Sequence, residues 1–434
     1  MRSASRSSRR ARHCWLLSSL ALASCTGLFQ GTKPAAVQSY AKKAVGETLL
    51  VGAAEAEITP TTPQYLAGYS LARVAEGVHS PLKARACVFE LGGERVAIVG
   101  IDSLGMHRED ADWIKSGIPG FANGNVFLCS SHTHAAPDLI GFWGWYLLSS
   151  GRDRAYLQQV RAGVAKAVAA ALAAAKPARL SHGSAELPPQ GLVRNTNRPE
   201  VFDRRFHVVQ AHDAQSGAPL AAILHLACHP EVLRRGNTKV SADFVHDLCE
   251  RWQQAGLGQP VFVNGALGAM VTPAVRPNGE EGIPIMGQRL FTLAQAAARA
   301  AVPLGVRELE VRRRDVFVEL TSPPLLLGRL SLAILRPAYG GEMRSTVGYL
   351  RLGPLEIATV PGEIEPGFAA DLRARAHRPE MLVFGLVDDE LGYLMRVADA
   401  RDPEFAYERL MSPCVDAGER VFSALVTTSP SRVR

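Results

Sequence analysis

The cysteines of this chain show no C-x-x-C spacing, although the sequence contains seven of them. Five lie outside the N-terminal segment, and an odd number cannot all form disulfides. We expect most of the five to be small buried hydrophobic residues. A disulfide between Cys228 and Cys249 is the alternative, since an exported chain would meet an oxidising compartment.

The sequence also lacks a strong charge imbalance outside its first 24 residues. Five arginines and no acidic residue lie in that segment, and the rest has 43 Lys and Arg against 41 Asp and Glu. A charge this small predicts neither nucleic-acid binding nor a polybasic membrane surface.

Long hydrophobic runs are absent as well. The apolar run 15–23 is too short for a membrane span, and it follows a basic stretch, as in a secretory signal. Residues 22–25 resemble a bacterial lipobox, in which Cys25 would be lipidated; the alternative is an ordinary signal peptide with an incidental cysteine. We therefore expect an exported protein, periplasmic or at the cell surface, anchored to the membrane through Cys25.

Short apolar runs alternate with amphipathic ones, without internal repeats or a Pro/Gly/Ser-rich linker. The runs predict strands at 94–102, 125–129, 221–227, 260–263 and 381–387, and helices at 157–172, 242–254, 287–301 and 413–425. This alternation predicts an α/β or mixed α+β fold. We expect a signal segment at 1–25, a tether at 26–48, one catalytic domain at 49–428 and a tail at 429–434.

The strongest local motif is Ser131-His132-Thr133-His134, directly after a predicted strand. Histidines at i and i+2 of an extended segment point to the same side, so both could reach one metal ion. Neutral imidazole suits zinc. The alternative is a pair of ordinary loop histidines.

Two further motifs end on candidate ligands. His229 closes a predicted strand just before Pro230, while His225 inside that strand is expected to be a core histidine. Glu363 lies at the entrance of a predicted helix, where a carboxylate could bind metal or simply stabilise the helix end. Asp243 is expected to cap the helix that follows it.

These motifs together resemble the neutral/alkaline, non-lysosomal ceramidase family, over roughly residues 50 to 425. Six segments occur in the family's order: Ala56-Glu57-Ile58-Thr59-Pro60, Ala67-Gly68-Tyr69, Ser131-His132-Thr133-His134, Ala227-Cys228-His229-Pro230, Ser241-Ala242-Asp243-Phe244 and Val360-Pro361-Gly362-Glu363.

The resemblance implies a zinc ion held by two histidines, a glutamate and a tyrosine, which fall on His132, His229, Glu363 and Tyr393. It also implies three further active-site residues: His134 near the zinc-bound water, Tyr407 and Arg198. Bound zinc lowers the pKa of water to about 7. In this scheme His134 would move the proton, and Arg198 or Tyr407 would stabilise negative charge.

The chain departs from the family at three places. The sequence around Tyr393 lacks the family's usual tyrosine- and threonine-rich pattern. Thr272 stands where the family carries an active-site serine, within a segment that lacks the neighbouring acid. We also expect no C-terminal immunoglobulin-like domain after the catalytic domain.

These observations predict a zinc-dependent hydrolase that cleaves the N-acyl amide bond of ceramide or a related lipid by attack of metal-bound water. The alternatives are hydrolysis of another acyl amide or ester, and a non-catalytic lipid-binding surface lipoprotein of the same fold. The aromatic run 142–146 could line an acyl groove or pack locally. The leucine-rich stretch 325–335 could face lipid or be buried.

Overall fold

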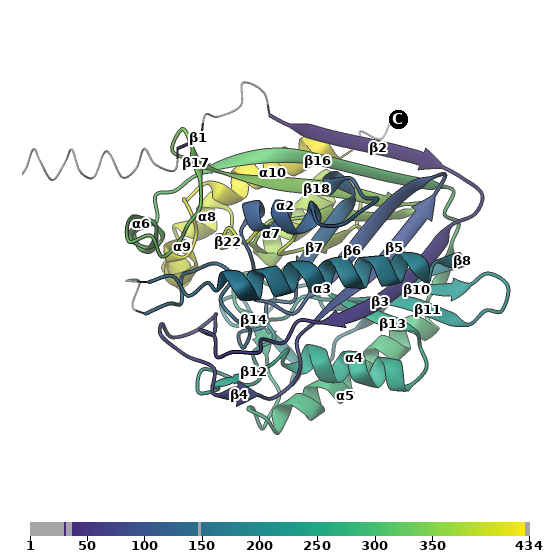
Figure 1. The fold of residues 1–434 in the computed structure, drawn as a ribbon, viewed down its shortest axis with the longest axis horizontal. Coiled ribbons are helices and arrows are strands. Elements are labelled where there is room, and N and C mark those ends of the chain that lie inside the picture. Colours follow the sequence, from purple (N-terminus) through teal and green to yellow (C-terminus); the bar gives the residue numbers. More distant parts are fainter. Residues whose placement is uncertain (1–29, 32–36, 146–148, 430–434) are drawn as a thin grey trace, which may run out of the picture.

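Two β-sheets stacked face to face form the centre of the molecule, and helices cover the outer face of each (Figure 1). The structure is a computed structural model that describes residues 30–31, 37–145 and 149–429. The predicted signal segment with Cys25 and the aromatic Tyr146 lie outside these residues. The mixed α/β architecture expected from the alternating sequence pattern is confirmed.

The larger sheet has nine strands and is antiparallel except at its two ends, where β11 pairs with β13 and β6 with β7 in parallel. Its order is β13 (Gln259–Asn264), β11 (Pro219–Leu226), β10 (Arg205–Asp213), β8 (Lys176–Glu186), β3 (Leu50–Glu57), β5 (Lys83–Leu91), β6 (Glu94–Ile101) and β7 (Val126–Ser130), with β15 (Val302–Leu304) beside β8.

The second sheet has seven strands. Its order is β1 (Gln30–Gly31), β17 (Ala338–Tyr339), β18 (Glu342–Leu352), β16 (Glu308–Glu319) and β2 (Ser39–Val45), while β19 (Leu355–Thr359) pairs with β18 and with β21 (Leu382–Phe384). Three short pairs complete the strands: β4 (Gly77–Val78) with β12 (Lys239–Val240), β9 (Val193–Asn195) with β14 (Val271–Pro273), and β20 (Glu363–Ile364) with β22 (Tyr393–Leu394).

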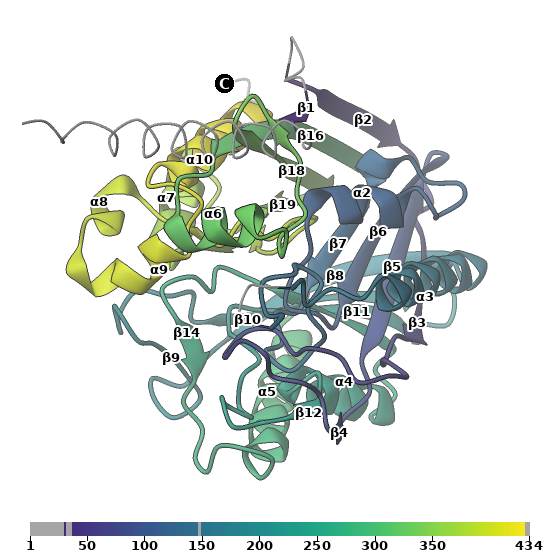
Figure 2. The ribbon, with the colours of Figure 1, turned by 60° about the vertical axis from the view of Figure 1, so that its left-hand side comes forward.

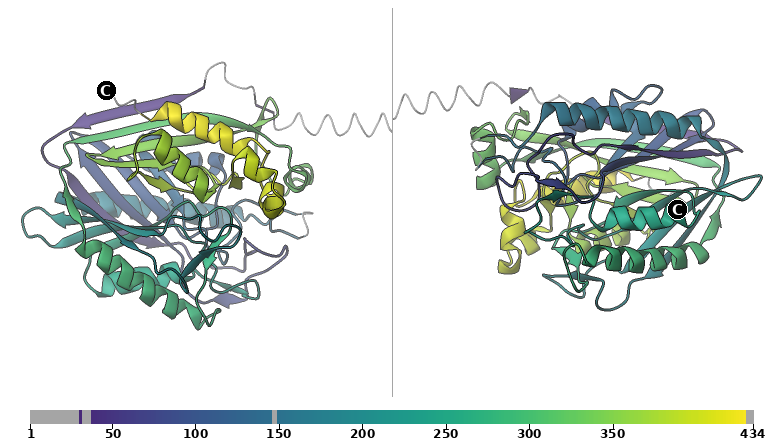
Figure 3. Two further views of the ribbon diagram at one scale, coloured as in Figure 1. Left: turned by 180° about the vertical axis from the view of Figure 1, so that it is seen from behind. Right: turned by 60° about the horizontal axis from the view of Figure 1, so that its bottom comes forward.

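Helices of the first layer are α2 (Arg108–Lys115), α3 (Arg154–Ala173), α4 (Phe244–Gln254) and α5 (Gly282–Arg299), and they pack on the nine-stranded sheet. On the seven-stranded sheet lie α7 (Pro366–Arg375) and α10 (Ala417–Thr428), seen from behind in Figure 3. The short helices α6 (Pro323–Leu330), α8 (Val397–Ala400) and α9 (Ala406–Leu410) lie at one end of the molecule (Figure 2).

Strand β5 illustrates how the central strands are covered on both faces. Ala84, Ala86 and Val88 face the core under α3, whereas Cys87 and Phe89 face the second sheet. Because successive side chains point to opposite faces and both faces are covered, residues 86–89 of β5 are apolar without alternation. Helix α3 begins at Asp153, whose carboxylate accepts from the backbone N–H groups of residues 155 and 156.

Most predicted elements are present, with shifted ends. The run at 381–387 gives a strand of three residues only, β21, because the chain then turns through the left-handed residues Leu386 and Asp388. Part of the expected tether is wrong: residues 39–45 form β2, which pairs with β16. Only Ala44 of β2 is buried, so backbone hydrogen bonding rather than apolar burial holds this edge strand.

All five cysteines of the described chain are buried and free: Cys87, Cys129, Cys228, Cys249 and Cys414. The considered Cys228–Cys249 disulfide is therefore absent, and the expectation of buried small residues is confirmed. Among the residues that the structure describes, no helix has the length and apolar character needed to cross a bilayer.

A buried ion cluster joins the two sheets at β7. Asp388 pairs with Lys115 of α2 at 2.7 Å and with Arg313 of β16, and its second oxygen accepts from the N–H of Leu128. Arg313 also donates to the carbonyl of Val126 at 2.6 Å. The charges of Arg313 and Lys115 overcome burial and lower the pKa of Asp388 to about 2. The carboxylate is thus the shared counter-charge of two buried cations.

We expect Asp388→Ala to lower the free energy of unfolding by about 3–5 kcal/mol, because it leaves two cations buried without a counter-charge. Urea denaturation measures the change. The matched control is Glu280→Gln, which removes one partner of the exposed Lys239–Glu280 pair and should leave the midpoint unchanged. Equal midpoints for Asp388→Ala and the unsubstituted chain would contradict this account of the cluster.

Candidate metal centre

The predicted ligands come from three parts of the fold that meet beyond the ends of β7 and β11. His132 and His134 follow β7, His229 follows β11, and Glu363 and Tyr393 are neighbours in register across the β20–β22 pair. Strands β7 and β11, from the two halves of the nine-stranded sheet, thus place their histidines close together.

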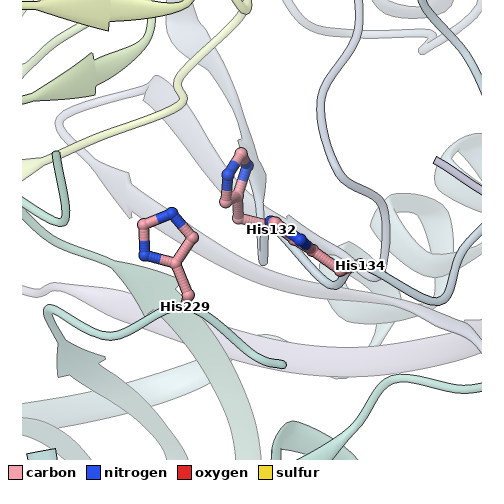
Figure 4. Close-up of side chains that lie close together, drawn as sticks. All are labelled: His132, His134 and His229. Carbon is pink, nitrogen blue, oxygen red and sulfur yellow. The ribbon is translucent and has the colours of Figure 1, made fainter. Parts of the chain in front are cut away.

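Three buried histidines form a cluster that could bind a metal ion. His132, His134 and His229 each offer a nitrogen, and these nitrogens all lie within 4.8 Å of one another. The ring centroids are 5.0 to 5.5 Å apart. Figure 4 shows the three side chains close together, with His132 and His134 on one loop and His229 on the other.

The sequence pattern suggested an extended segment for the first histidine loop, but the loop turns at His132 instead. His132 has a left-handed backbone with φ of 68°, which a non-glycine residue rarely adopts. The N–H of His132 donates to the carbonyl of Ser103 at 2.8 Å, which holds the turn. The two histidines therefore converge through a strained turn, and such strain is concentrated at functional sites.

Hydrogen bonds fix the orientation of two imidazoles. Nδ1 of His132 lies 2.7 Å from the carbonyl oxygen of Leu104, and Nδ1 of His229 lies 2.8 Å from that of Val271. A carbonyl oxygen only accepts, so each Nδ1 carries the proton. In the neutral rings each Nε2 then has a lone pair, the arrangement found in metal-binding histidines.

Both Nε2 atoms face the same carboxylate oxygen. Oε2 of Glu363 lies 3.1 Å from Nε2 of His229 and 3.5 Å from Nε2 of His132. Burial favours the neutral acid, but the two histidines hold the pKa of Glu363 far below its ordinary value. Against the effect of burial, Glu363 also raises the pKa of His229. The three groups require a positive charge between them, either a proton or a cation.

Asn264, at the end of β13, braces the two histidine loops. Its amide nitrogen donates to the carbonyls of Ser131 and Cys228 at 2.8 and 2.9 Å, and its oxygen accepts from the N–H of Cys228. Ser131 and Cys228 directly precede His132 and His229. Sequence reasoning did not identify this residue, because one asparagine at a strand end carries no distinctive pattern.

His134 lies between an aromatic ring and a carboxylate. Its ring is 4.8 Å from that of Tyr69, and its Nδ1 is 3.8 Å from Oε2 of Glu231. Burial lowers the pKa of His134 to about 3, although Glu231 opposes the shift. Neither ring nitrogen has a hydrogen-bond partner among the described residues, so both are free for a ligand. A Cβ on Gly68 would lie 2.5 Å from the His134 ring.

Glu231 is a central residue that sequence reasoning missed. It accepts from the hydroxyl of Tyr69 at 2.7 Å and from the hydroxyl of Thr272. Despite burial, His134 and His229 lower the pKa of Glu231 to about 2, so it is a carboxylate. The acid two residues after His229 was the available signal. Thr272, on β14, is buried and its hydroxyl is committed to this carboxylate.

The two predicted tyrosines lie side by side at the opposite edge of the cluster. The rings of Tyr393 and Tyr407 are 6.0 Å apart, and both line the cavity described below. Burial and the charge of Glu363 raise the pKa of Tyr393 well above its usual value. The phenol is therefore protonated in the absence of a cation.

Two other predicted residues lie away from the histidines. Arg198 pairs with Asp399 at 2.7 Å and lies over the ring of Phe405, so its predicted role in the active site stays a prediction. Asp243 caps α4 as expected, accepting from the N–H of Phe244 at 2.8 Å. It also accepts from Val232 and thereby holds the loop of His229.

A cavity opens beside the cluster. Its wall is largely apolar, with a few ionisable groups at the histidine end. The lining residues include Leu104, His107, His132, His134, Ile140, Phe142, Trp143, Leu325, Ile334, Arg336, Met343, Glu363, Glu390, Leu391, Tyr393, Tyr407 and Met411. Phe142 and Trp143 of the aromatic run thus face this space. An apolar cavity with a few polar groups in its wall is the usual form of a small-molecule site.

Comparison with known proteins identifies relatives of the chain. Residues 49–266 match the family model "Neutral/alkaline non-lysosomal ceramidase, N-terminal", a range that contains His132, His134 and His229 but not Glu363 or Tyr393. The chain is 26% identical over 306 residues to neutral ceramidase of Pseudomonas aeruginosa, which covers 63% of this chain and 45% of that protein. It is 25% identical over 228 residues to neutral ceramidase B of Dictyostelium discoideum, 48% of this chain and 32% of the relative. The matched region thus spans less than half the length of either relative.

Solved structures share the fold. The crystal structure of the Pseudomonas aeruginosa neutral ceramidase matches with a TM-score of 0.68 at 20% identity, over 89% of this chain and 75% of that one. A ceramidase complexed with C2 matches with a TM-score of 0.73 at 19% identity, over 88% and 75%. Half of the chain fits the family model, and the same half carries the three clustered histidines. The chain therefore belongs to the neutral/alkaline non-lysosomal ceramidase family.

Proposed function

We propose that the protein is a zinc-dependent hydrolase that cleaves the N-acyl amide bond of ceramide or a related lipid. The observation that carries the proposal is the pair of imidazoles whose Nε2 atoms converge on one buried carboxylate oxygen, at the end of an apolar cavity. Family membership supports it, as does the likeness to ceramidase structures.

The residues at the cluster fit a divalent cation. His132, His229 and Glu363 would hold it, with Tyr393 as a fourth ligand. Two neutral imidazoles and a carboxylate suit zinc. When bound, such an ion supplies Lewis acidity toward an amide carbonyl and acidifies water. The mutual repulsion of the lone pairs on Nε2 and on Glu363 would then be relieved.

His134 is the group proposed to move the proton. It is neutral at pH 7 and its Nδ1 faces Glu231, so Nε2 accepts a proton from the attacking water. The water oxygen bonds to the acyl carbon, the C–N bond breaks, and the same proton passes to the leaving amine. Glu231 stabilises the imidazolium formed in between. Tyr407, at the cavity wall, is suited to donate a hydrogen bond to the developing negative charge.

The apolar cavity supports a lipid substrate. Phe142, Trp143, Ile334 and Met343 would contact the acyl chain and exclude water from it. Relatives named neutral ceramidase make ceramide the first substrate to test.

One observation favours a second candidate, a hydrolase of another acyl amide or ester. The hydroxyl of Thr272 is committed to Glu231, and the guanidinium of Arg198 is committed to Asp399. Two groups that the family resemblance assigns to the active site thus already have protein partners. A pocket whose polar contacts differ from those of the family would favour a substrate with a different head group.

We further propose that the catalytic domain at 49–428 is exported and anchored through a lipidated Cys25. The basic N-terminal stretch followed by a short apolar run supports this localisation.

We expect the purified protein to contain about one zinc per chain and to release fatty acid from ceramide, with activity lost on chelation and restored by added zinc. Elemental analysis and a fatty-acid release assay on the same preparation measure both. Zinc without ceramide hydrolysis would move the search to a panel of other acyl amides and esters. Absence of metal, together with activity that withstands chelation, would contradict the proposal.

His229→Ala should lower the metal content to below about a tenth of a zinc per chain, because it removes one of the converging Nε2 atoms. The matched control is His225→Ala. His225 is equally buried, but its Nε2 bonds to the carbonyl of Val383 and not to Glu363. Elemental analysis of the two variants should therefore differ. Near-stoichiometric zinc in His229→Ala would refute the assigned ligands.

Gly68→Ala should lower kcat/KM by about a hundredfold, because the added Cβ displaces the His134 ring and small misplacements at the reacting centre are costly. Zinc content should stay near that of the unsubstituted protein. Gly217→Ala is the control, since no atom lies within 4 Å of its added Cβ, while its φ of 74° gives alanine the same kind of backbone strain as the 98° of Gly68. Unchanged kinetics in Gly68→Ala would show that His134 does not need its position.

A further inference from the structure

Five leucines are exposed together around the short helices α6 and α9. They are Leu327, Leu330, Leu332, Leu335 and Leu410, with exposed fractions between 39% and 55%. We refer to these five as the leucine rim. Within the described ranges, no leucine elsewhere on the molecule is exposed to this extent. A clustered apolar surface of this kind indicates a binding surface, whereas single exposed residues do not.

The segments that carry the leucine rim also line the cavity. Leu325 and Arg329 on α6 point into the cavity, while Leu327 and Leu330 on the same helix point outward. Ile334 and Met411 line the cavity next to the exposed Leu335 and Leu410 in sequence. The segments that carry the leucine rim on their outer side therefore form part of the cavity wall on their inner side.

Direct contacts hold the rim segments together. The hydroxyl of Ser322, just before α6, donates to the carbonyl of Leu410 at the end of α9, at 2.7 Å. On the other side, the carbonyl of Ala333 fills the space beside Gly141, next to the cavity residue Phe142. Figures 1 and 2 show α6 and α9 side by side at one end of the molecule. The apolar surface is thus a fixed part of the fold.

The charge of this surface is one-sided. From residue 321 to residue 341 the chain has no acidic residue, and its two charged side chains are Arg329 and Arg336. Arg336 is buried and paired with Asp389, and Arg329 lines the cavity. On α9 the exposed charge next to Leu410 is Arg409, because Glu408 is buried. Exposed leucines beside the exposed Arg409 complement a phospholipid surface, whose acyl region accepts leucine and whose phosphates accept arginine.

We propose that the leucine rim docks on a phospholipid bilayer, so that the cavity opens directly toward the membrane. The role of this docking rests on the proposed function: a two-chain lipid substrate would pass from the bilayer into the cavity without crossing water. The continuity of rim and cavity favours a bilayer over a protein partner, because a protein covering the rim would close the opening.

Vesicle sedimentation tests the docking without any turnover. The full chain is mixed with phosphatidylcholine vesicles that contain no N-acyl substrate. We expect the double variant Leu327→Glu with Leu330→Glu to partition onto the vesicles at least about tenfold less than the unsubstituted chain, since it puts charge in place of two inserting leucines. All variants share one N-terminus, so any contribution of Cys25 cancels.

The matched control is Val45→Glu with Val302→Glu. These valines are 70% and 62% exposed, at the end of β2 and on β15, which pairs with β8. In Figure 1 the label of β8 lies at the opposite end of the molecule from α6 and α9. Partition of this control should equal that of the unsubstituted chain. Zinc content and hydrolysis of a short-chain, water-soluble N-acyl substrate should be unchanged in both double variants, which separates a docking defect from a failure of the proposed activity.

Equal partition of the rim variant and the unsubstituted chain would overturn the proposal. So would a concentration-dependent dimer, seen by light scattering, that the rim substitutions abolish, because the rim would then bind a second copy of the chain. Loss of vesicle binding in the rim variant alone supports the proposal, even if no substrate on the panel is hydrolysed.

Discussion

The buried carboxylate of Glu363 determines what the surrounding structure must provide. Two imidazoles present Nε2 to one of its oxygens, and their Nδ1 protons are already bonded to the carbonyls of Leu104 and Val271. Two lone pairs beside a buried anion repel one another unless a positive charge lies between them. The arrangement of the two loops therefore favours binding of a cation. The surrounding fold holds the strained backbone of these loops, such as the left-handed His132, in place.

The fold supplies that stability through a few polar side chains at strand ends. Asn264 bonds to the backbone before both histidines, and Asp243 bonds to the loop after His229. Asp388 ties β7, which carries the first histidine loop, to α2 and to the second sheet. Each of these groups is buried and satisfied, so a change at any of them would be transmitted to the imidazoles rather than absorbed by solvent.

The sequence predicted most strands and the residues that end them, because a strand buried on both faces is an uninterrupted run of apolar residues in the sequence. It predicted the meeting of His132, His229 and Glu363 only through the family resemblance. The turn at His132 depends on Ser103, and the brace at Asn264 spans more than a hundred residues, so neither leaves a local pattern. Strand β2 was missed for the opposite reason: its side chains are mostly exposed and only its hydrogen bonds to β16 define it.

Glu231 connects His134, which matches the family motif, with Thr272, which stands where the family carries a serine. Its carboxylate faces His134 on one side and accepts the hydroxyls of Tyr69 and Thr272 on the other. A threonine hydroxyl that donates to an anion cannot give that proton to a substrate at the same time, although its oxygen can still accept a hydrogen bond. The chemistry proposed for the histidine cluster is therefore compatible with this chain, whereas recognition of the substrate head group must use Thr272 as an acceptor, or other residues of the cavity wall.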